Sequence, residues 1–251
     1  MNRLVLYCDP SMDPLPEVTV AEYDLVTVHY TRDLVDAIVD EPRLVGVVML
    51  MRVADESWQR LIVSVKKSFP LMPMLVGTRA PFAKPPGTIE TFTFTDVNDK
   101  TSERVTTFAR EHAATERREH HRFDFPLRAK LDSADTPIHH IGQISAGGAF
   151  LIPNKTDLTP GTICEIELLF QNFSITTNCE ILNPRHVDSR AGDGFGIRFT
   201  SLSPAATSFI DRIVHDALIE TMMNPDARPP VPSLDEDEDL LSIGDEFSLS
   251  I

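Results

Sequence analysis

Short apolar runs alternate with amphipathic segments along the first part of the chain. The apolar runs, each typical of a buried strand, occupy residues 4–8, 23–28, 44–51, 72–76 and 89–94. Thr31 and Asp55 are placed to cap two helices, and the second helix carries Trp58, Leu61, Ile62 and Val65 on one face. The third run has no charged interruption, as in parallel strands covered on both faces. This alternation predicts a parallel sheet flanked by helices over residues 1–97.

A third helical pattern covers residues 98–118 and ends in a pair of arginines. Its apolar stripe is formed by Val105, Phe108, Ala109 and His112. No Gly or Pro interrupts the segment before Arg117 and Arg118. The sequence therefore predicts that residues 98–122 form a linker helix followed by a basic strap, which we define as residues 116–122. If the helix packs on the first domain, it connects that domain directly to the strap.

The pattern changes to short alternating β segments after residue 122. They occupy residues 125–131, 138–144, 148–152, 162–170, 173–182 and 194–199 and are separated by Pro, Gly and Asn. Ser203 and Pro204 then open a helix with Phe209, Ile210, Ile213, Val214, Ala217 and Leu218 at helical spacing. Residues 123–223 are therefore expected to form a six-stranded antiparallel β-barrel with a helix over an open end.

A two-residue turn at 171–172 sets a register for one hairpin of this barrel. Counting outward from Phe170 opposite Phe173 places Cys164 opposite Cys179 on an apolar face. The opposite face carries Glu165, Glu167, Asn178 and Glu180. We expect the cysteines to be neighbours in the barrel interior. We favour two small core residues kept reduced over a redox-sensing pair.

Composition narrows the class of protein. The 251 residues are 42% hydrophobic and 24% charged, as in ordinary globular domains. The net charge of −15 argues against general nucleic-acid binding, which requires a basic face. No apolar run reaches the length of a membrane-spanning helix and residues 1–4 lack the layout of a secretion signal, so we expect a cytoplasmic protein without membrane insertion. The three cysteines are too few for a disulfide scaffold and have no CxxC spacing.

Two short motifs carry the candidate binding chemistry. The strap contains Arg118 and Arg122, and the segment 143–151 contains Gln143, Ser145, Gly147 and Gly148. A guanidinium can donate two hydrogen bonds to a phosphate or to the O6/N7 edge of guanine. Ser145 supplies a hydroxyl, and the two glycines let backbone N–H groups approach a ligand closely.

Together the motifs resemble the signature of the PilZ family, RxxxR followed by (D/N)xSxxG, and Gly194–Phe199 resembles the family's closing strand. The resemblance implies a β-barrel that binds the bacterial second messenger cyclic di-GMP through the residues of both motifs. Gln143 stands where the family has Asp or Asn, and its longer, uncharged side chain is expected to weaken binding without abolishing it. In the family, an arginine directly before RxxxR accompanies binding of an intercalated ligand dimer, and Arg117 holds that position.

The order of strands and helices over residues 1–97 resembles a response-regulator receiver domain of the flavodoxin-like α/β class. Receivers need several acids to hold Mg²⁺ for phosphoryl transfer to a carboxylate. Here Asp9 alone remains of the acidic pair, and the third strand ends at Met51 without the acceptor Asp. The resemblance implies a pseudo-receiver used for interaction.

Other features of the sequence argue against metal binding and catalysis. The side chains within His120–His121 and within His139–His140 point to opposite faces of an extended segment, and no thiolate or carboxylate is patterned with them. We expect the first pair to pack against bound bases instead. No nucleophile–base constellation or phosphate loop occurs, so we expect no metal, no cofactor and no enzymatic activity.

Residues 224–251 form a Pro-rich tail with eight acidic side chains against one basic one. Such composition predicts disorder. The apolar residues among the acids leave two interpretations open, a docking motif that folds on a partner and a solubilising tail.

These features predict a non-enzymatic cyclic di-GMP receptor that relays the signal to a protein partner through the pseudo-receiver or the acidic tail. The process controlled would be motility, pilus function, secretion or transcription. The alternative is a ligand-independent adaptor that keeps the barrel as a protein-interaction scaffold, with Gln143 marking a degraded site. The sequence leaves the oligomeric state open, a homodimer included.

Overall fold

The computed structural model of the chain describes most of both predicted domains. The described residues are 3–12, 18–20, 22–41, 44–53, 55–80, 89–94, 99–113, 120–132, 138–154, 158–187, 192–224 and 247–249. The chain divides into two compact units, one formed by residues 1–119 with 218–227 and the other by residues 120–217 with 228–251. Among the described helices, none is both long and apolar enough to span a membrane.

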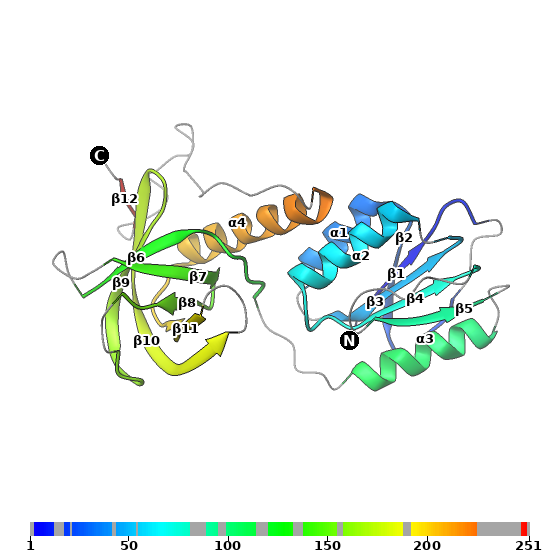
Figure 1. Ribbon diagram of the computed structural model, residues 1–251, viewed down its shortest axis with the longest axis horizontal. Coiled ribbons are helices and arrows are strands. Elements are labelled where there is room, and N and C mark those ends of the chain that lie inside the picture. Colours follow the sequence, from blue (N-terminus) through cyan, green and yellow to red (C-terminus); the bar gives the residue numbers. More distant parts are fainter. Residues whose placement is uncertain are drawn as a thin grey trace. The chain divides into compact units, whose positions relative to one another are not determined.

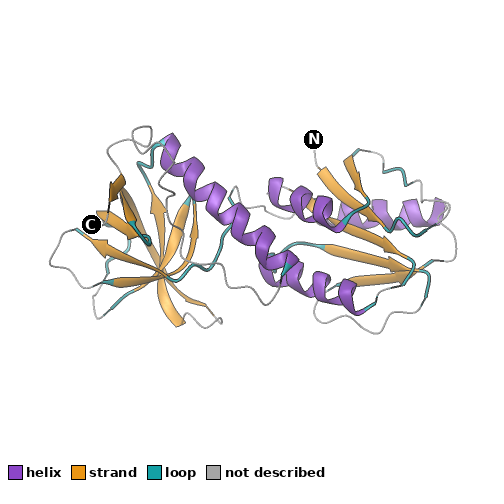
Figure 2. Cartoon of the chain, turned by 90° about the horizontal axis from the view of Figure 1, so that it is seen from above, coloured by secondary structure: helices purple, strands orange, loops and turns teal. Residues whose placement is uncertain are grey.

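The N-terminal unit is built on a five-stranded parallel sheet, as predicted (Figures 1 and 2). Its strands are β1 (Arg3–Cys8), β2 (Asp24–Val28), β3 (Leu44–Met51), β4 (Met74–Thr78) and β5 (Glu90–Thr93), in the order β2-β1-β3-β4-β5. The helices are α1 (Thr31–Asp40), α2 (Glu56–Ser68) and α3 (Asp99–His112). Figure 1 shows α1 and α2 on one face of the sheet and α3 on the other. Every residue of β3 is buried, which agrees with a central strand covered on both faces.

One of the two predicted helix caps is present. The Oδ1 atom of Asp55 accepts a hydrogen bond from the backbone N–H of Trp58 at 3.1 Å, and so caps α2. The predicted cap at Thr31 is wrong, because α1 begins at Thr31 itself and the N-cap position falls on Tyr30, which makes no side-chain cap hydrogen bond. A hydroxyl caps a helix only from the residue that precedes the first helical one.

Helix α3 packs on the N-terminal sheet. Val105, Phe108 and Ala109 are buried in one cluster with residues of β1, β3 and β4. At the edge of the sheet, Glu90 of β5 binds the guanidinium of Arg104, and its Oε1 atom lies 3.1 Å from Nε2 of His112. Burial alone would raise the pKa of Glu90, but hydrogen bonds from His112 and Arg104 lower it overall. The predicted linker helix is therefore held in the N-terminal unit through its apolar stripe and an ion-pair network.

The second unit is the predicted six-stranded antiparallel barrel. Its strands are β6 (Leu127–Leu131), β7 (His139–Ser145), β8 (Gly148–Ile152), β9 (Ile163–Leu169), β10 (Phe173–Val187) and β11 (Gly192–Phe199). They follow the order β11-β8-β7-β6-β9-β10, and the pairing of β10 with β11 closes the ring. Helix α4 (Pro204–Met223) begins at the predicted proline, and Oγ of Ser203 accepts the N–H of Ala206 at 3.1 Å.

The start of α4 packs against the β9–β10 turn. The ring of Phe209 lies edge-on to Phe170 and Phe173, with centroid distances of 5.8 and 5.2 Å. Phe170 and Phe173 stack on each other across the hairpin with their centroids 4.5 Å apart. This aromatic cluster closes one end of the barrel core and confirms the predicted position of the helix.

The predicted hairpin register is confirmed. Leu168 pairs with Ile175 and Cys164 with Cys179, and the two sulfur atoms lie 3.6 Å apart in the buried interior. The predicted outer face, Glu165, Glu167, Asn178 and Glu180, is exposed or half-buried. Burial raises the pKa of both thiols, which keeps them protonated and poorly nucleophilic. Both cysteines are free, as expected of small core residues.

One part of the acidic tail departs from the predicted disorder. Phe247–Leu249 form a strand, β12, that pairs antiparallel with the first residues of β10. The remainder of the tail, residues 225–246 and 250–251, lies outside the described residues.

A buried histidine at the start of β7 faces the barrel core. His139 is 1% exposed, whereas His140 is exposed, so the pair points to opposite faces as predicted. The backbone N–H of Asn154 donates to Nδ1 of His139 at 3.1 Å, which requires that nitrogen to be unprotonated. Burial, with a smaller contribution from His140, lowers the pKa of His139 below its ordinary value of 6.5.

The free energy of unfolding should therefore decrease as the pH falls through the ordinary histidine pKa of 6.5. Below pH 6.5 this histidine binds a proton in the unfolded chain, whereas folded His139 stays neutral until a lower pH. Proton binding therefore stabilises the unfolded state, and the free energy of unfolding decreases as the pH falls towards the lowered pKa of the folded state. Urea unfolding at about pH 7.5 and about pH 5.5 measures the effect. His139→Gln should reduce the difference and His140→Gln should retain most of it. Equal pH dependence in the parent and His139→Gln would contradict the assignment.

Candidate functional site

The second predicted motif forms the tight turn between β7 and β8. Ser145 pairs with Gly148 across the ladder, and Ala146 and Gly147 form the turn. Oγ of Ser145 donates a hydrogen bond to the carbonyl of Gly148 at 3.1 Å, and this serine is only 4% exposed. Gln143, half-buried on β7, pairs with Phe150 of β8. The serine hydroxyl thus holds the turn in shape, and its oxygen can still accept a hydrogen bond.

The two glycines of the turn have different roles. Gly148 is buried with φ +156, and a Cβ there would lie 2.1 Å from the carbonyl oxygen of Ile197 on β11. Gly147 is exposed, and a Cβ there would meet only Cδ2 of His120, at 3.2 Å. Gly148 is therefore required by the packing of the barrel, whereas Gly147 leaves the backbone of the turn accessible to a ligand.

The end of the strap is hydrogen-bonded directly beside this turn. The N–H of Phe123 donates to the carbonyl of Ile144 at 3.0 Å, and the N–H of Ile144 donates back to the carbonyl of Phe123 at 2.9 Å. Continuing this antiparallel register brings Arg122 towards Ser145. The approach of His120 to Gly147 agrees with the same register. Residues 120–123, which include one motif arginine, thus lie alongside the second motif.

The structure places some of the predicted site residues and leaves others open. Arg122 is described and its side chain is exposed, on the same barrel edge as Gln143, Ser145 and the two glycines. Arg117 and Arg118 lie outside the described residues. Their positions in the site therefore remain predictions.

Two further side chains near the turn were missed by the sequence analysis. Nδ1 of His120 lies 3.2 Å from Oδ1 of Asp211 on α4, a pair separated by 91 positions. Arg198 of β11 pairs with Gly148 in the ladder, and its guanidinium binds Glu180. No local pattern marks Asp211, because its contact depends on how α4 packs. Arg198 lies in the predicted closing strand, so the barrel register could have indicated it.

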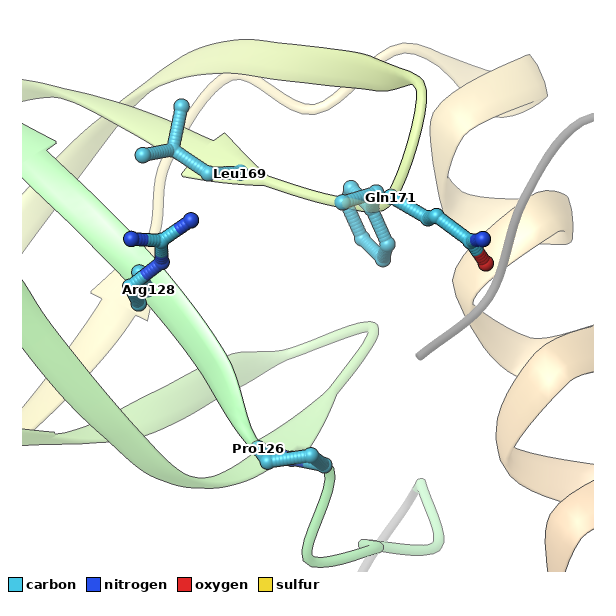
Figure 3. Close-up of a pocket in the computed structure, with 5 residues that line it drawn as sticks. Pro126, Arg128, Leu169 and Gln171 are labelled. Carbon is cyan, nitrogen blue, oxygen red and sulfur yellow. The ribbon is translucent and has the colours of Figure 1, made fainter. Parts of the chain in front are cut away.

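A separate cavity of about 430 Å³ lies elsewhere on the barrel (Figure 3). Pro126, Arg128, Leu169, Phe170 and Gln171 line it, from the start of β6 and from the β9–β10 hairpin. None of the predicted site residues lines this cavity. The candidate site is instead the surface of the β7–β8 turn and the strap beside it.

The carboxyl edge of the N-terminal sheet carries no receiver-type acidic cluster in the part of the chain that is described. Oδ1 of Asp9 accepts the N–H of Ser11 at 2.8 Å, and Oδ2 accepts the N–H of Arg52 at 3.3 Å. Both carboxylate oxygens therefore hold the loops after β1 and β3.

A potential metal-ligand cluster among the described residues is Glu90, Glu111 and His112, whose ligand atoms lie within 4.8 Å of one another. Glu90 already binds Arg104 there, so this group is part of the ion-pair network of α3. Lys or Arg in direct contact with a carboxylate opposes the binding of a second cation.

Comparison with known families decides the nature of the barrel. Residues 116–216 match the family model of the PilZ domain, from the strap to α4. This part of the chain is a PilZ domain. The PilZ family is a receptor family without catalytic function, which agrees with the predicted lack of enzymatic activity for residues 116–216. The match covers the barrel and does not extend over the N-terminal α/β unit.

The PilZ domain is similar to several solved structures. The PilZ domain of Escherichia coli YcgR with c-di-GMP is 19% identical over 45% of this chain and 100% of that one, with a TM-score of 0.36. The K. pneumonia MrkH–c-di-GMP complex is 19% identical over 43% and 56%, with a TM-score of 0.35. The Bacillus subtilis inhibitor of motility is 12% identical over 39% and 51%, with a TM-score of 0.35, so this chain spans about half of the latter two proteins. The comparison with curated proteins gave no match.

The different roles of the two glycines can be tested by substitution. Gly148→Ala should lower the free energy of unfolding of the barrel by about 2 kcal/mol or more, because its methyl group would overlap the Ile197 carbonyl. Gly147→Ala is the matched control and should stay within about 0.5 kcal/mol of the parent. Denaturant unfolding monitored by circular dichroism measures both values. Similar losses in the two variants would contradict the packing role of Gly148.

Proposed function

We propose that the PilZ domain of this chain binds cyclic di-GMP and that the protein is a receptor that relays the ligand-bound state to a protein partner. The observation that supports this most directly is the pair of hydrogen bonds between Phe123 and Ile144. These bonds hold the end of the RxxxR strap against the strand that carries Gln143 and Ser145. Arg122, at the described end of the strap, thus lies beside the strand that carries the second motif, and Arg118 is proposed to approach the same edge.

The proposed roles follow from the chemistry of the ligand, which offers two phosphates and two guanines. Arg118 and Arg122 would donate paired hydrogen bonds to a phosphate or to the O6/N7 edge of guanine. The exposed backbone at Gly147 would approach the ligand without a Cβ in the way, and Gln143 would offer its side-chain amide. His120 is expected to pack near a base, held in place by Asp211.

The N-terminal α/β unit is proposed to be the pseudo-receiver through which the partner is contacted. Supporting this, both carboxylate oxygens of Asp9 accept backbone hydrogen bonds, and Arg52 follows β3 where a phosphate acceptor would stand. A Mg²⁺-dependent phosphoryl acceptor needs several free carboxylates at this edge. Interaction, and not phosphorylation, is therefore the proposed role of this unit, and the cytoplasm is the proposed location of the protein.

The alternative is a ligand-independent adaptor built on the same barrel. Two observations favour it: the hydroxyl of Ser145 already bonds the Gly148 carbonyl, and Gln143 replaces the acidic or Asn side chain of the family signature. Calorimetric titration of the purified protein with cyclic di-GMP separates the two proposals. If the titration gives negligible heat at roughly tens of micromolar ligand, the result favours the ligand-independent adaptor.

Removing either strap arginine should abolish most binding. Arg118→Ala and Arg122→Ala should each weaken the affinity by about ten- to a hundredfold, since a charge-assisted hydrogen-bonded contact contributes roughly 1.5–3 kcal/mol. Gln143→Asp serves as the control on the second motif and should bind at least as tightly as the parent. Isothermal titration calorimetry gives the dissociation constants of the parent and the three variants. Parent-like affinity in both arginine variants would rule out the proposed site.

We further expect two ligands per protomer. Arg117 precedes the RxxxR strap, where its guanidinium could reach the second molecule of an intercalated ligand dimer. Arg117→Ala should reduce the stoichiometry from two to one while leaving binding of the first ligand largely intact. The binding isotherm and equilibrium dialysis both report this number. A stoichiometry of one in the parent protein would contradict the prediction.

A further inference from the structure

The first part of β10 has an edge that β11 does not cover. On one side β9 pairs with β10 from Ser174 to Glu180. On the other side β11 pairs with β10 only from Cys179 to Val187. The residues before Asn178 therefore present backbone groups beyond the reach of β11 and of the two residues that follow it. An open strand edge is a template for another strand.

The direction of these backbone groups follows from the hairpin turn. The N–H of Phe170 donates to the carbonyl of Phe173 at 3.0 Å, so the backbone groups of Phe173 face β9. Because successive residues of an antiparallel strand alternate, those of Ser174 face the opposite edge. Asn178 obeys the same alternation, since its carbonyl accepts the N–H of Thr200 and its N–H donates to Oγ of Ser201 at that edge.

Strand β12 occupies this edge. Its three residues pair antiparallel with the first three residues of β10. Ser248 lies opposite Ser174, and the pairs on either side are Phe173–Leu249 and Ile175–Phe247. By the alternation, the N–H of Ser248 faces β10 and the N–H groups of its two neighbours face away. The local burial agrees with a covered strand: Ser174, on the outward face, is 2% exposed, whereas the outward residue Asn178 is exposed.

The occupancy of the edge by β12 should be reversible. A three-residue strand makes few hydrogen bonds, and it belongs to the same chain as β10, so a separate peptide must compete with an intramolecular strand. We propose that this edge of β10 is a docking site for an extended strand and that its resident is the chain's own segment Phe247–Leu249. The kind of partner that could replace it is an extended peptide with a free N–H opposite Ser174, bound by strand addition.

The test uses the full chain and a fluorescent peptide of residues 243–251. Ser248→Pro removes the N–H that faces Ser174 and should release the segment. The peptide should then bind the Ser248→Pro protein at least about tenfold more tightly than the parent, in which the tethered segment competes. Ser248→Ala keeps the backbone N–H and should behave as the parent. Fluorescence anisotropy gives the three affinities.

Two modified peptides provide a matched control for the direction of the hydrogen bonds. N-methylation at Ser248 should abolish binding to the Ser248→Pro protein, whereas N-methylation at Phe247 should preserve it, because that N–H faces away from β10. In the proteins themselves, amide hydrogen exchange at Ser174 should be slow in the parent and faster in Ser248→Pro.

Several results would overturn the proposal. These are equal binding of the peptide to the parent and Ser248→Pro, equal binding of the two methylated peptides, and unchanged exchange at Ser174. No cyclic di-GMP is present in these measurements, so their outcome is independent of the proposed ligand site.

Discussion

The close approach of Gly148 to the carbonyl of Ile197 is the constraint on which the arrangement of the barrel depends most. It lets β8 lie against β11 directly after the β7–β8 turn, and the pairing of β11 with β10 then closes the ring. A side chain at this position would push β8 away from β11 at the point where the candidate site begins. The same glycine thus serves the closure of the barrel and the shape of the turn, and Gly147 beside it is free for recognition.

Charge is distributed unevenly in this acidic chain, and the distribution is suited to an anionic ligand. The described end of the strap brings Arg122 beside the exposed turn residue Gly147. The described acids near it are already engaged: Asp211 lies against His120, and Glu180 binds Arg198. Pairing of these acids limits their repulsion of a phosphate. A local cationic site can therefore exist within a protein whose net charge is −15.

Strand β10 organises the rest of the second unit. It pairs with β9 along one side as far as Glu180, and with β12 and then β11 along the other side. Its inward residues build the core around Cys164, Cys179 and the aromatic cluster with Phe209. Edges left open in a sheet invite association with other chains. The short strand β12 supplies that cover from the chain's own tail, in a form that can be exchanged.

Local and periodic features were predictable from the sequence by itself. The parallel sheet, the six barrel strands, the start of α4 at Pro204 and the Cys164–Cys179 pairing all follow from alternation, turn chemistry and helix punctuation. The motif residues were also selected as candidates in this way, because their identity and spacing are local, and their role in binding stays a prediction. The error at Thr31 shows the limit of such signals, since a helix boundary misplaced by one residue removes the cap.

Contacts between distant segments were decided only by the tertiary structure. The pairing of Phe123 with Ile144, the contact of His120 with Asp211 and the pairing of β12 with β10 leave no periodic trace in the sequence. Each depends on where the barrel brings two segments together, and on which backbone edge its register leaves open. The chain therefore determines which groups could form a site, and the closed barrel determines which of them meet.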